Sequence, residues 1–164
     1  MAPKFWRYTD EFLRSLARHQ MTDVHDKKTR SYNMSRIRAK DTKPEMIVRK
    51  CLFSKGFRYR LHDGRLPGKP DLVLPKFRTV IFVNGCFWHG HKGCKYFVLP
   101  KNNQEWWLRK INRNRELDEK NTGELNRTGW QVITIFECEL KKGKLESTLE
   151  NTIRRIRQSD NQNN

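Results

Sequence analysis

The segment IFVNGCFWHGHKGC, residues 81–94, most constrains what this chain can fold into. It begins as a short, apolar run rich in β-branched residues, which is typical of a buried strand. It continues into a loop that holds two cysteines and two histidines among three glycines. Thiolates and imidazoles bind zinc tetrahedrally, and glycines permit the tight turns between ligands. The sequence therefore predicts a strand that runs into a zinc loop.

Three residues of this loop have the spacing of metal ligands. Cys86, His91 and Cys94 form a Cys-x4-His-x2-Cys pattern, which can surround one ion. A fourth ligand must come from Cys138, just after a predicted strand, or from His89 within the loop. Cys51 stands among apolar residues of a predicted helix and is interpreted as a core thiol.

The composition indicates a nucleic-acid partner. Among 164 residues, 35 Lys and Arg stand against 18 Asp and Glu, which gives a formal charge of +17. Such an excess attracts polyanions. No apolar run is long enough to span a membrane, and the charged N-terminus does not resemble a signal peptide, so we expect a cytoplasmic protein.

The order of predicted elements indicates an α/β fold, with a mixed central sheet flanked by helices. Helices are predicted over residues 9–19, 42–55, 103–122 and 147–156, and strands over 57–61, 71–74, 79–83 and 130–137. We expect an N-terminal extension over 1–22, a basic DNA-contacting arm over 23–44, one domain over 45–158 and a disordered tail over 159–164. Met21 is a second candidate start.

The loop also carries two large aromatic residues, Phe87 and Trp88, between its ligands. They can pack over the metal site, or they can stack on bases or wedge between them from a rigid loop. Trp106 and Trp107 repeat the aromatic pair at the start of the next predicted helix, which favours the wedge.

Candidate catalytic groups come from several segments. Pro70-Asp71 before a strand is the layout of PD-(D/E)XK nucleases, although the next strand offers Phe82-Val83-Asn84 and lacks the expected Glu and Lys. His89 has a side chain suited to proton transfer near neutral pH. Glu45 begins a helix, and a second helix carries one stripe at helical spacing, namely Trp107, Ile111, Asn114 and Asp118.

The chain resembles one known family. PGKPDLVL, IFVNGCFWHGHKGC, YFVLPKNNQEWWLRKINRNRELD and GWQVITIFECEL occur in the order found in the Vsr family of very-short-patch repair endonucleases. The arm VHDKKTRSYNMSRI is also similar, so the resemblance covers about residues 23–140. It implies a bacterial enzyme with a restriction-endonuclease-like, zinc-braced fold that nicks DNA 5′ to the T of a T:G mismatch left by deamination of 5-methylcytosine.

The resemblance also implies roles for individual residues. Asp71 and the backbone carbonyl of Val83 match ligands of a catalytic Mg²⁺. The implied active-site residues are Glu45, His89 and Asp118. The implied zinc ligands are Cys86, His91, Cys94 and Cys138, which leaves His89 for catalysis. Phe87, Trp88 and Trp107 match aromatics that enter the DNA stack. A monomer and coupling to a MutL-type mismatch-repair protein are implied as well.

The chain departs from the family pattern at two places. Asn84 stands where some members carry a second active-site histidine, and an amide cannot shuttle a proton. The loop has His-x2-Cys where some members have His-x-Cys. Two alternative functions stay open from the residues alone. One is a restriction- or defence-type nuclease that cuts matched DNA, and the other is a zinc-braced DNA-binding module without catalysis.

Overall fold

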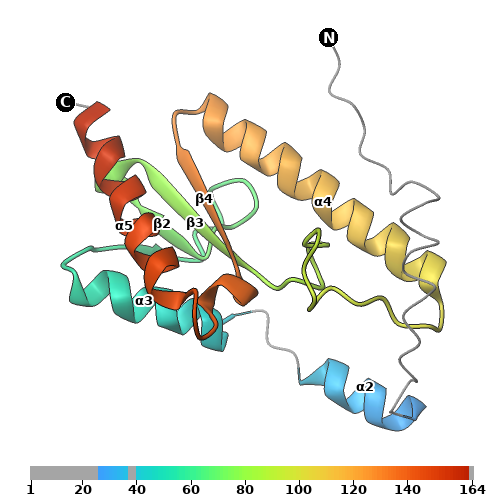
Figure 1. Cartoon of the computed structure of the whole chain (residues 1–164). Coiled ribbons are helices and arrows are strands. Elements are labelled where there is room, and N and C mark those ends of the chain that lie inside the picture. Colours follow the sequence, from blue (N-terminus) through green and yellow to red (C-terminus); the bar gives the residue numbers. More distant parts are fainter. Residues whose placement is uncertain (1–25, 37–39, 163–164) are drawn as a thin grey trace.

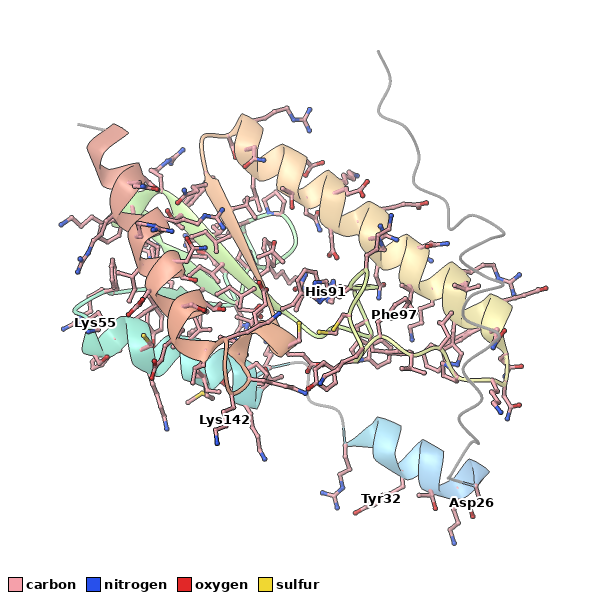
Figure 2. The ribbon with its side chains drawn as sticks, viewed as in Figure 1. Asp26, Tyr32, Lys55, His91, Phe97 and Lys142 are labelled. Carbon is pink, nitrogen blue, oxygen red and sulfur yellow. The ribbon has the colours of Figure 1, made fainter. Side chains whose placement is uncertain are left out.

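The computed structural model describes residues 26–36 and 40–162 of the chain. The predicted N-terminal extension, with its helix over 9–19, lies outside these residues. The basic arm is described in part: α2 spans Lys27–Ser35, and the Asp26 carboxylate accepts a hydrogen bond from the Thr29 N–H at 2.7 Å at its start. Figure 2 shows Tyr32 on this helix and Asp26 just before it, to one side of the sheet.

A four-stranded mixed sheet forms the centre of the fold, as predicted (Figure 1). Its strands are β1 (Arg60–Leu61), β2 (Leu72–Leu74), β3 (Thr79–Asn84) and β4 (Gln131–Phe136). The order is β1-β2-β3-β4, with antiparallel pairing except between β3 and β4, which are parallel. β1 is shorter than the predicted strand 57–61, because Phe57 packs into the core and the ladder to β2 begins at Arg60.

Helices cover both faces of this sheet (Figure 1). On one face, α3 (Lys43–Ser54) and α5 (Leu145–Gln162) bury side chains such as Leu52 and Ile156 against Leu72, Ile81 and Ile133 of the strands. On the other face, α4 (Gln104–Arg127) packs Leu125 against Val73 and Val80. Each strand contributes side chains to both cores, because successive side chains point to opposite faces of the sheet.

Helix ends follow from local chemistry. Thr42 caps α3 as predicted, with its hydroxyl accepting from the Glu45 N–H at 3.4 Å, and Gly56 follows the helix at φ 85°. α5 runs past the predicted end at 156 and into the segment 159–164 that was expected to be disordered. The reason is that Ser159 is 7% exposed and its hydroxyl lies 2.5 Å from Oε1 of Gln131 on β4, so the helix is packed there.

The parallel pair β3–β4 brings distant residues together. Two parallel strands end at the same edge of a sheet, so the loop after Asn84 lies beside the short 3₁₀ turn η2 (Glu137–Leu140) that follows β4. α4 makes the crossover between these strands and runs past the same loop (Figure 1). No helix in the described ranges has an apolar stretch long enough to cross a membrane.

Candidate active site and metal cluster

Asp71 stands immediately before β2, at the end of the loop that connects β1 to β2. Its Oδ2 accepts the Val83 N–H of the neighbouring strand at 2.7 Å, and its backbone carbonyl accepts the His62 N–H at 3.2 Å. Burial raises the pKa of Asp71; the Val83 hydrogen bond opposes this shift, and the negative charge of Glu45 adds to it. An ionised carboxylate here is therefore costly without a cation beside it.

Two further residues lie behind Asp71. Glu45, in the first turn of α3, is only 2% exposed, and one carboxylate oxygen lies 3.4 Å from Arg49 Nη1 and 3.2 Å from His62 Nε2. Nδ1 of His62 lies 3.8 Å from Oδ1 of Asp71. No sequence motif singles out His62. The hairpin pattern could have revealed it, because the pairing of Leu61 with Leu72 places residue 62 opposite Asp71.

Asp71 opens onto a cavity of about 260 Å³ that gathers most of the predicted catalytic residues. Val83 and Asn84 line it from the end of β3, His89 from the loop and Asp118 from α4. His89 Nδ1 lies 2.5 Å from Oδ2 of Asp118, as expected for a histidine oriented by a carboxylate. The remaining lining residues are Gly68, Lys69, Phe82, Asn121, Thr122 and Thr134. Glu45 does not line this cavity.

The predicted stripe of α4 does face the loop. Ile111 is fully buried, the side-chain amide of Asn114 donates to the Trp88 carbonyl at 2.9 Å, and Asp118 holds His89. Trp107, at the N-terminal end of the stripe, meets Phe87 edge-on with ring centroids 5.2 Å apart. One face of the helix therefore positions both the aromatic pair and the histidine.

Phe87, Trp88 and Trp107 form one aromatic cluster. Trp88 meets Phe87 at 5.2 Å and Trp107 at 5.9 Å between centroids, and all three side chains are half-buried. The Lys110 ammonium lies over both tryptophan rings, 5.2 Å from the centroid of Trp88 and 5.8 Å from that of Trp107. The cluster is packed on itself and still reaches the surface beside the cavity that holds His89.

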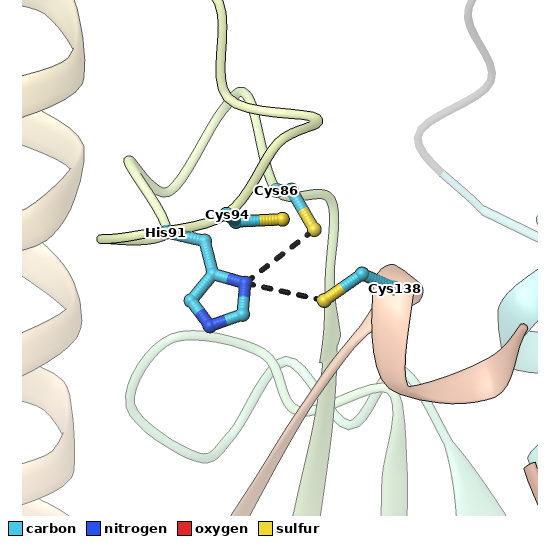
Figure 3. Close-up of side chains that lie close together, drawn as sticks. All are labelled: Cys86, His91, Cys94 and Cys138. Atoms are coloured by element: carbon cyan, nitrogen blue, oxygen red, sulfur yellow. Dashed lines mark hydrogen bonds between the residues drawn. The ribbon is translucent and has the colours of Figure 1, made fainter. Parts of the chain in front are cut away.

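The four predicted metal ligands lie close together (Figure 3). The ligand atoms of Cys86, His91, Cys94 and Cys138 all lie within 4.8 Å of one another. Nδ1 of His91 lies 3.6 Å from Sγ of Cys86 and 3.3 Å from Sγ of Cys138. Cys138 comes from η2, so the parallel strands deliver the fourth ligand. His89, the competing candidate, is turned to Asp118 instead.

Two of these thiols are costly to ionise without a cation beside them. Burial raises the pKa of Cys86 to about 12, and burial also raises the pKa of Cys138. For Cys94, burial acts upward but the hydrogen bonds it receives, first from the Tyr96 backbone, leave its pKa lowered. Three thiols and an imidazole converging on one point are the donor set of a structural zinc site. His91 is braced by stacking on Phe136, with centroids 3.8 Å apart and planes at 7°. Figure 2 places His91 between the sheet and α4.

Comparison with known proteins agrees with the resemblance. The family model described as DNA mismatch endonuclease Vsr matches residues 22–95. The type II nicking enzyme V.NmeAIP of Neisseria meningitidis is 49% identical over 138 residues, covering 84% of this chain and 98% of that protein. The type II nicking enzyme V.XorIIP of Xanthomonas oryzae is 46% identical, covering 81% and 98%. The DNA mismatch endonuclease Vsr of Escherichia coli K12 is 44% identical, covering 74% and 77%.

The fold, the site and these similarities place the chain in the class of DNA endonucleases. More narrowly, it belongs to the Vsr family of DNA mismatch endonucleases.

Proposed function

We propose that this protein is a Mg²⁺-dependent nickase that cuts duplex DNA 5′ to the T of a T:G mismatch. The observation that carries the proposal is one cavity that holds the Asp71 carboxylate and the His89–Asp118 pair, next to the aromatic cluster. Two relatives are named nicking enzymes and one a mismatch endonuclease, which supports single-strand cutting at a mismatch. The formal charge of +17 supports DNA as the substrate.

The residues around Asp71 fit a divalent cation. Burial and the charge of Glu45 raise the pKa of Asp71, and a cation would offset both effects. The Asp71 carboxylate and the Val83 carbonyl would hold Mg²⁺, which when bound would supply positive charge for the scissile phosphate. The Val83 N–H donates to Oδ2 and thereby restricts the rotation of the carboxylate that would bind the ion.

His89 is the proposed general base. Because Asp118 accepts the proton on Nδ1, Nε2 is the nitrogen that can take a proton from the attacking water. Asp118 then stabilises the imidazolium that forms. Asn84 is buried at the cavity wall, at 9% exposure, and its amide can donate a hydrogen bond to a phosphate oxygen. In this assignment Asn84 orients the phosphate and transfers no proton.

Phe87, Trp88 and Trp107 are proposed to enter the base stack beside the mismatch. A mismatched step costs less to unstack than a paired one, so the insertion favours mismatched DNA. Zinc in the Cys86, His91, Cys94 and Cys138 cluster would stiffen the loop that carries Phe87 and Trp88. Residues 23–44 are proposed as the DNA-contacting arm, and a monomer and a MutL-type partner stay predictions.

A strand-resolved nicking assay tests this function. Labelled duplexes with one T:G mismatch in several flanking contexts are incubated with Mg²⁺ and compared with T:A and C:G duplexes of the same sequences. A single nick 5′ to the mismatched T, absent from the matched duplexes, is the expected result. Equal cutting of matched duplexes would instead assign the protein to the restriction-type alternative.

A further inference from the structure

Glu45 is too deeply buried to act on DNA directly. It is 2% exposed and lies outside the set of residues that line the cavity. Burial is the main cause of the raised pKa of Asp71, and the negative charge of Glu45 adds to it, so the two carboxylates influence each other electrostatically. Two ionised carboxylates repel each other, so other groups must hold their separation.

His62 lies between these two carboxylates. Its Nε2 is 3.2 Å from Glu45 Oε1 and its Nδ1 is 3.8 Å from Asp71 Oδ1, while its backbone N–H donates to the Asp71 carbonyl at 3.2 Å. The 3.2 Å contact with Glu45 lacks the geometry of a full hydrogen bond, which leaves Nε2 buried and incompletely satisfied. Its two ring nitrogens therefore face two different carboxylates.

The backbone of His62 is also held in an uncommon conformation. Its φ is 48°, in the left-handed region that non-glycine residues seldom occupy, although His, Asn and Asp do so more often than others. Such a conformation persists where the surrounding structure determines it, and it gathers at functional sites. Here this conformation accompanies the placement of the imidazole between Glu45 and Asp71.

A separate cation between Glu45, His62 and Asp41 is disfavoured. The ligand atoms of these residues do lie within 4.8 Å of one another. However, the Arg49 guanidinium already contacts both carboxylates, at 2.5 Å from Asp41 and 3.4 Å from Glu45. A fixed positive charge at this point repels a metal ion, so the role of His62 lies on its Asp71 side.

We propose that His62 is a positioning residue. It holds the Glu45 and Asp71 carboxylates at a fixed separation and thereby sets the affinity of Asp71 for its divalent cation. This inference rests on the proposed function, because it takes Asp71 as the ligand of that cation. Groups that contact metal ligands fix the orientation of those ligands, and their removal commonly weakens metal binding about 10–100-fold. Glu45 acts on the cavity through this contact.

Two amide substitutions give a matched test. Both His62→Asn and His62→Gln place a donor amide at the turn. The Asn amide nitrogen is one bond closer to Cα than imidazole Nε2, whereas the Gln amide nitrogen is as far from Cα as Nε2 is. Asn also tolerates the positive φ. We expect His62→Asn to lose the contact with Glu45 and His62→Gln to keep it. Leu61→Ala, at the preceding residue, which is 37% exposed, is the control.

Mn²⁺ binding to the full chain without DNA is measured by the EPR signal of free Mn²⁺, with melting temperature as a check on folding. The Mg²⁺ concentration for half-maximal nicking of a T:G duplex is measured in parallel. His62→Asn is expected to weaken Mn²⁺ binding and raise the Mg²⁺ requirement, each about 10-fold or more. His62→Gln should lie closer to wild type, and Leu61→Ala should match it.

Asp71→Ala separates failure of this inference from failure of the proposed function. If Asp71→Ala loses Mn²⁺ binding while His62→Asn binds like wild type, the role of His62 is overturned and the metal site stands. If Asp71→Ala binds Mn²⁺ as wild type does, the assignment of the metal to Asp71 is overturned, and the inference about His62 falls with it.

Discussion

Replacing Asp118 by Asn should slow nicking for two reasons. The amide orients His89 less well, and the negative charge of the Asp118 carboxylate beside the imidazole is lost. The Asp118 carboxylate lies 2.5 Å from Nδ1 of His89 and is the group on α4 that holds this imidazole. Asn keeps the size of the side chain, but its amide can offer an N–H where a carboxylate oxygen accepted one. The variant therefore favours the tautomer that protonates Nε2, the nitrogen proposed to accept the proton.

The size of the effect follows from the exposure of the pair. A hydrogen bond to a charged group contributes about 1.5–3 kcal/mol when well shielded. The side chains of His89 and Asp118 are 27% and 39% exposed, so solvent screens part of this energy and about 1–2 kcal/mol remains. At 1.36 kcal/mol per tenfold change in rate, Asp118→Asn should slow nicking about 5- to 30-fold. His89→Ala removes the base itself and should slow it about 10²–10⁴-fold.

The rate is measured under single turnover on a T:G duplex with saturating Mg²⁺, so that the chemical step is observed. Glu119→Gln is the matched control, because it neutralises the next residue of α4, which is exposed and lies outside the cavity lining. Equal rates for Asp118→Asn and Glu119→Gln would refute the role of Asp118. A loss with Asp118→Asn as large as that with His89→Ala would refute the screening argument.

Three further predictions concern the metal cluster, the loop before Asp71 and the charge of Asp71. Cys138→Ser should lower both the zinc content by mass spectrometry and the melting temperature, since Ser is a poor zinc ligand, whereas Cys51→Ser, outside the cluster, should retain the metal. Gly68→Ala should lower the free energy of unfolding in urea by about 1–3 kcal/mol, because φ is 73° and the new Cβ would lie 2.9 Å from Nδ2 of Asn121. Gly64→Ala should leave this free energy unchanged, because no atom lies within 4 Å of its new Cβ. Asp71→Asn should raise the melting temperature at pH 7 without Mg²⁺. Burial raises the pKa of Asp71 above the ordinary value of 3.8, so the wild type loses stability as the pH rises from about that value through the folded pKa. The gain should vanish below pH 3.8, and a gain that is independent of pH would contradict this explanation.

The sheet and the metal cluster could be predicted because their signals are local. The apolar strand 79–83 and the strand 130–137 are short β-branched runs, and the structure has β3 and β4 there. Cys138 became a ligand candidate because it follows the second of these strands. The choice between Cys138 and His89 needed the parallel pairing of β3 and β4, which a pattern of residues does not specify by itself.

His62 could not be recognised from its own sequence context. Its importance depends on the hairpin register that sets it against Asp71 and on the packing of α3, which brings Glu45 from seventeen positions earlier in the chain. The end of α5 was missed for a similar reason. The polar sequence around Ser159 favours disorder, but the contact with Gln131 on β4 adds a tertiary stabilisation that local propensity does not include.

The measurement that tests the central claim most directly separates DNA binding from cutting in the cavity. Wild type, Asp71→Ala and His89→Ala are titrated with a T:G duplex without Mg²⁺, and nicking of the same duplex is then followed after Mg²⁺ is added. The account predicts that both variants bind the duplex like wild type, that Asp71→Ala fails to nick it and that His89→Ala nicks it at least about 10²-fold more slowly. Nicking by Asp71→Ala at the wild-type rate would contradict the account, because the strand would then be cut without the carboxylate that is proposed to hold the metal.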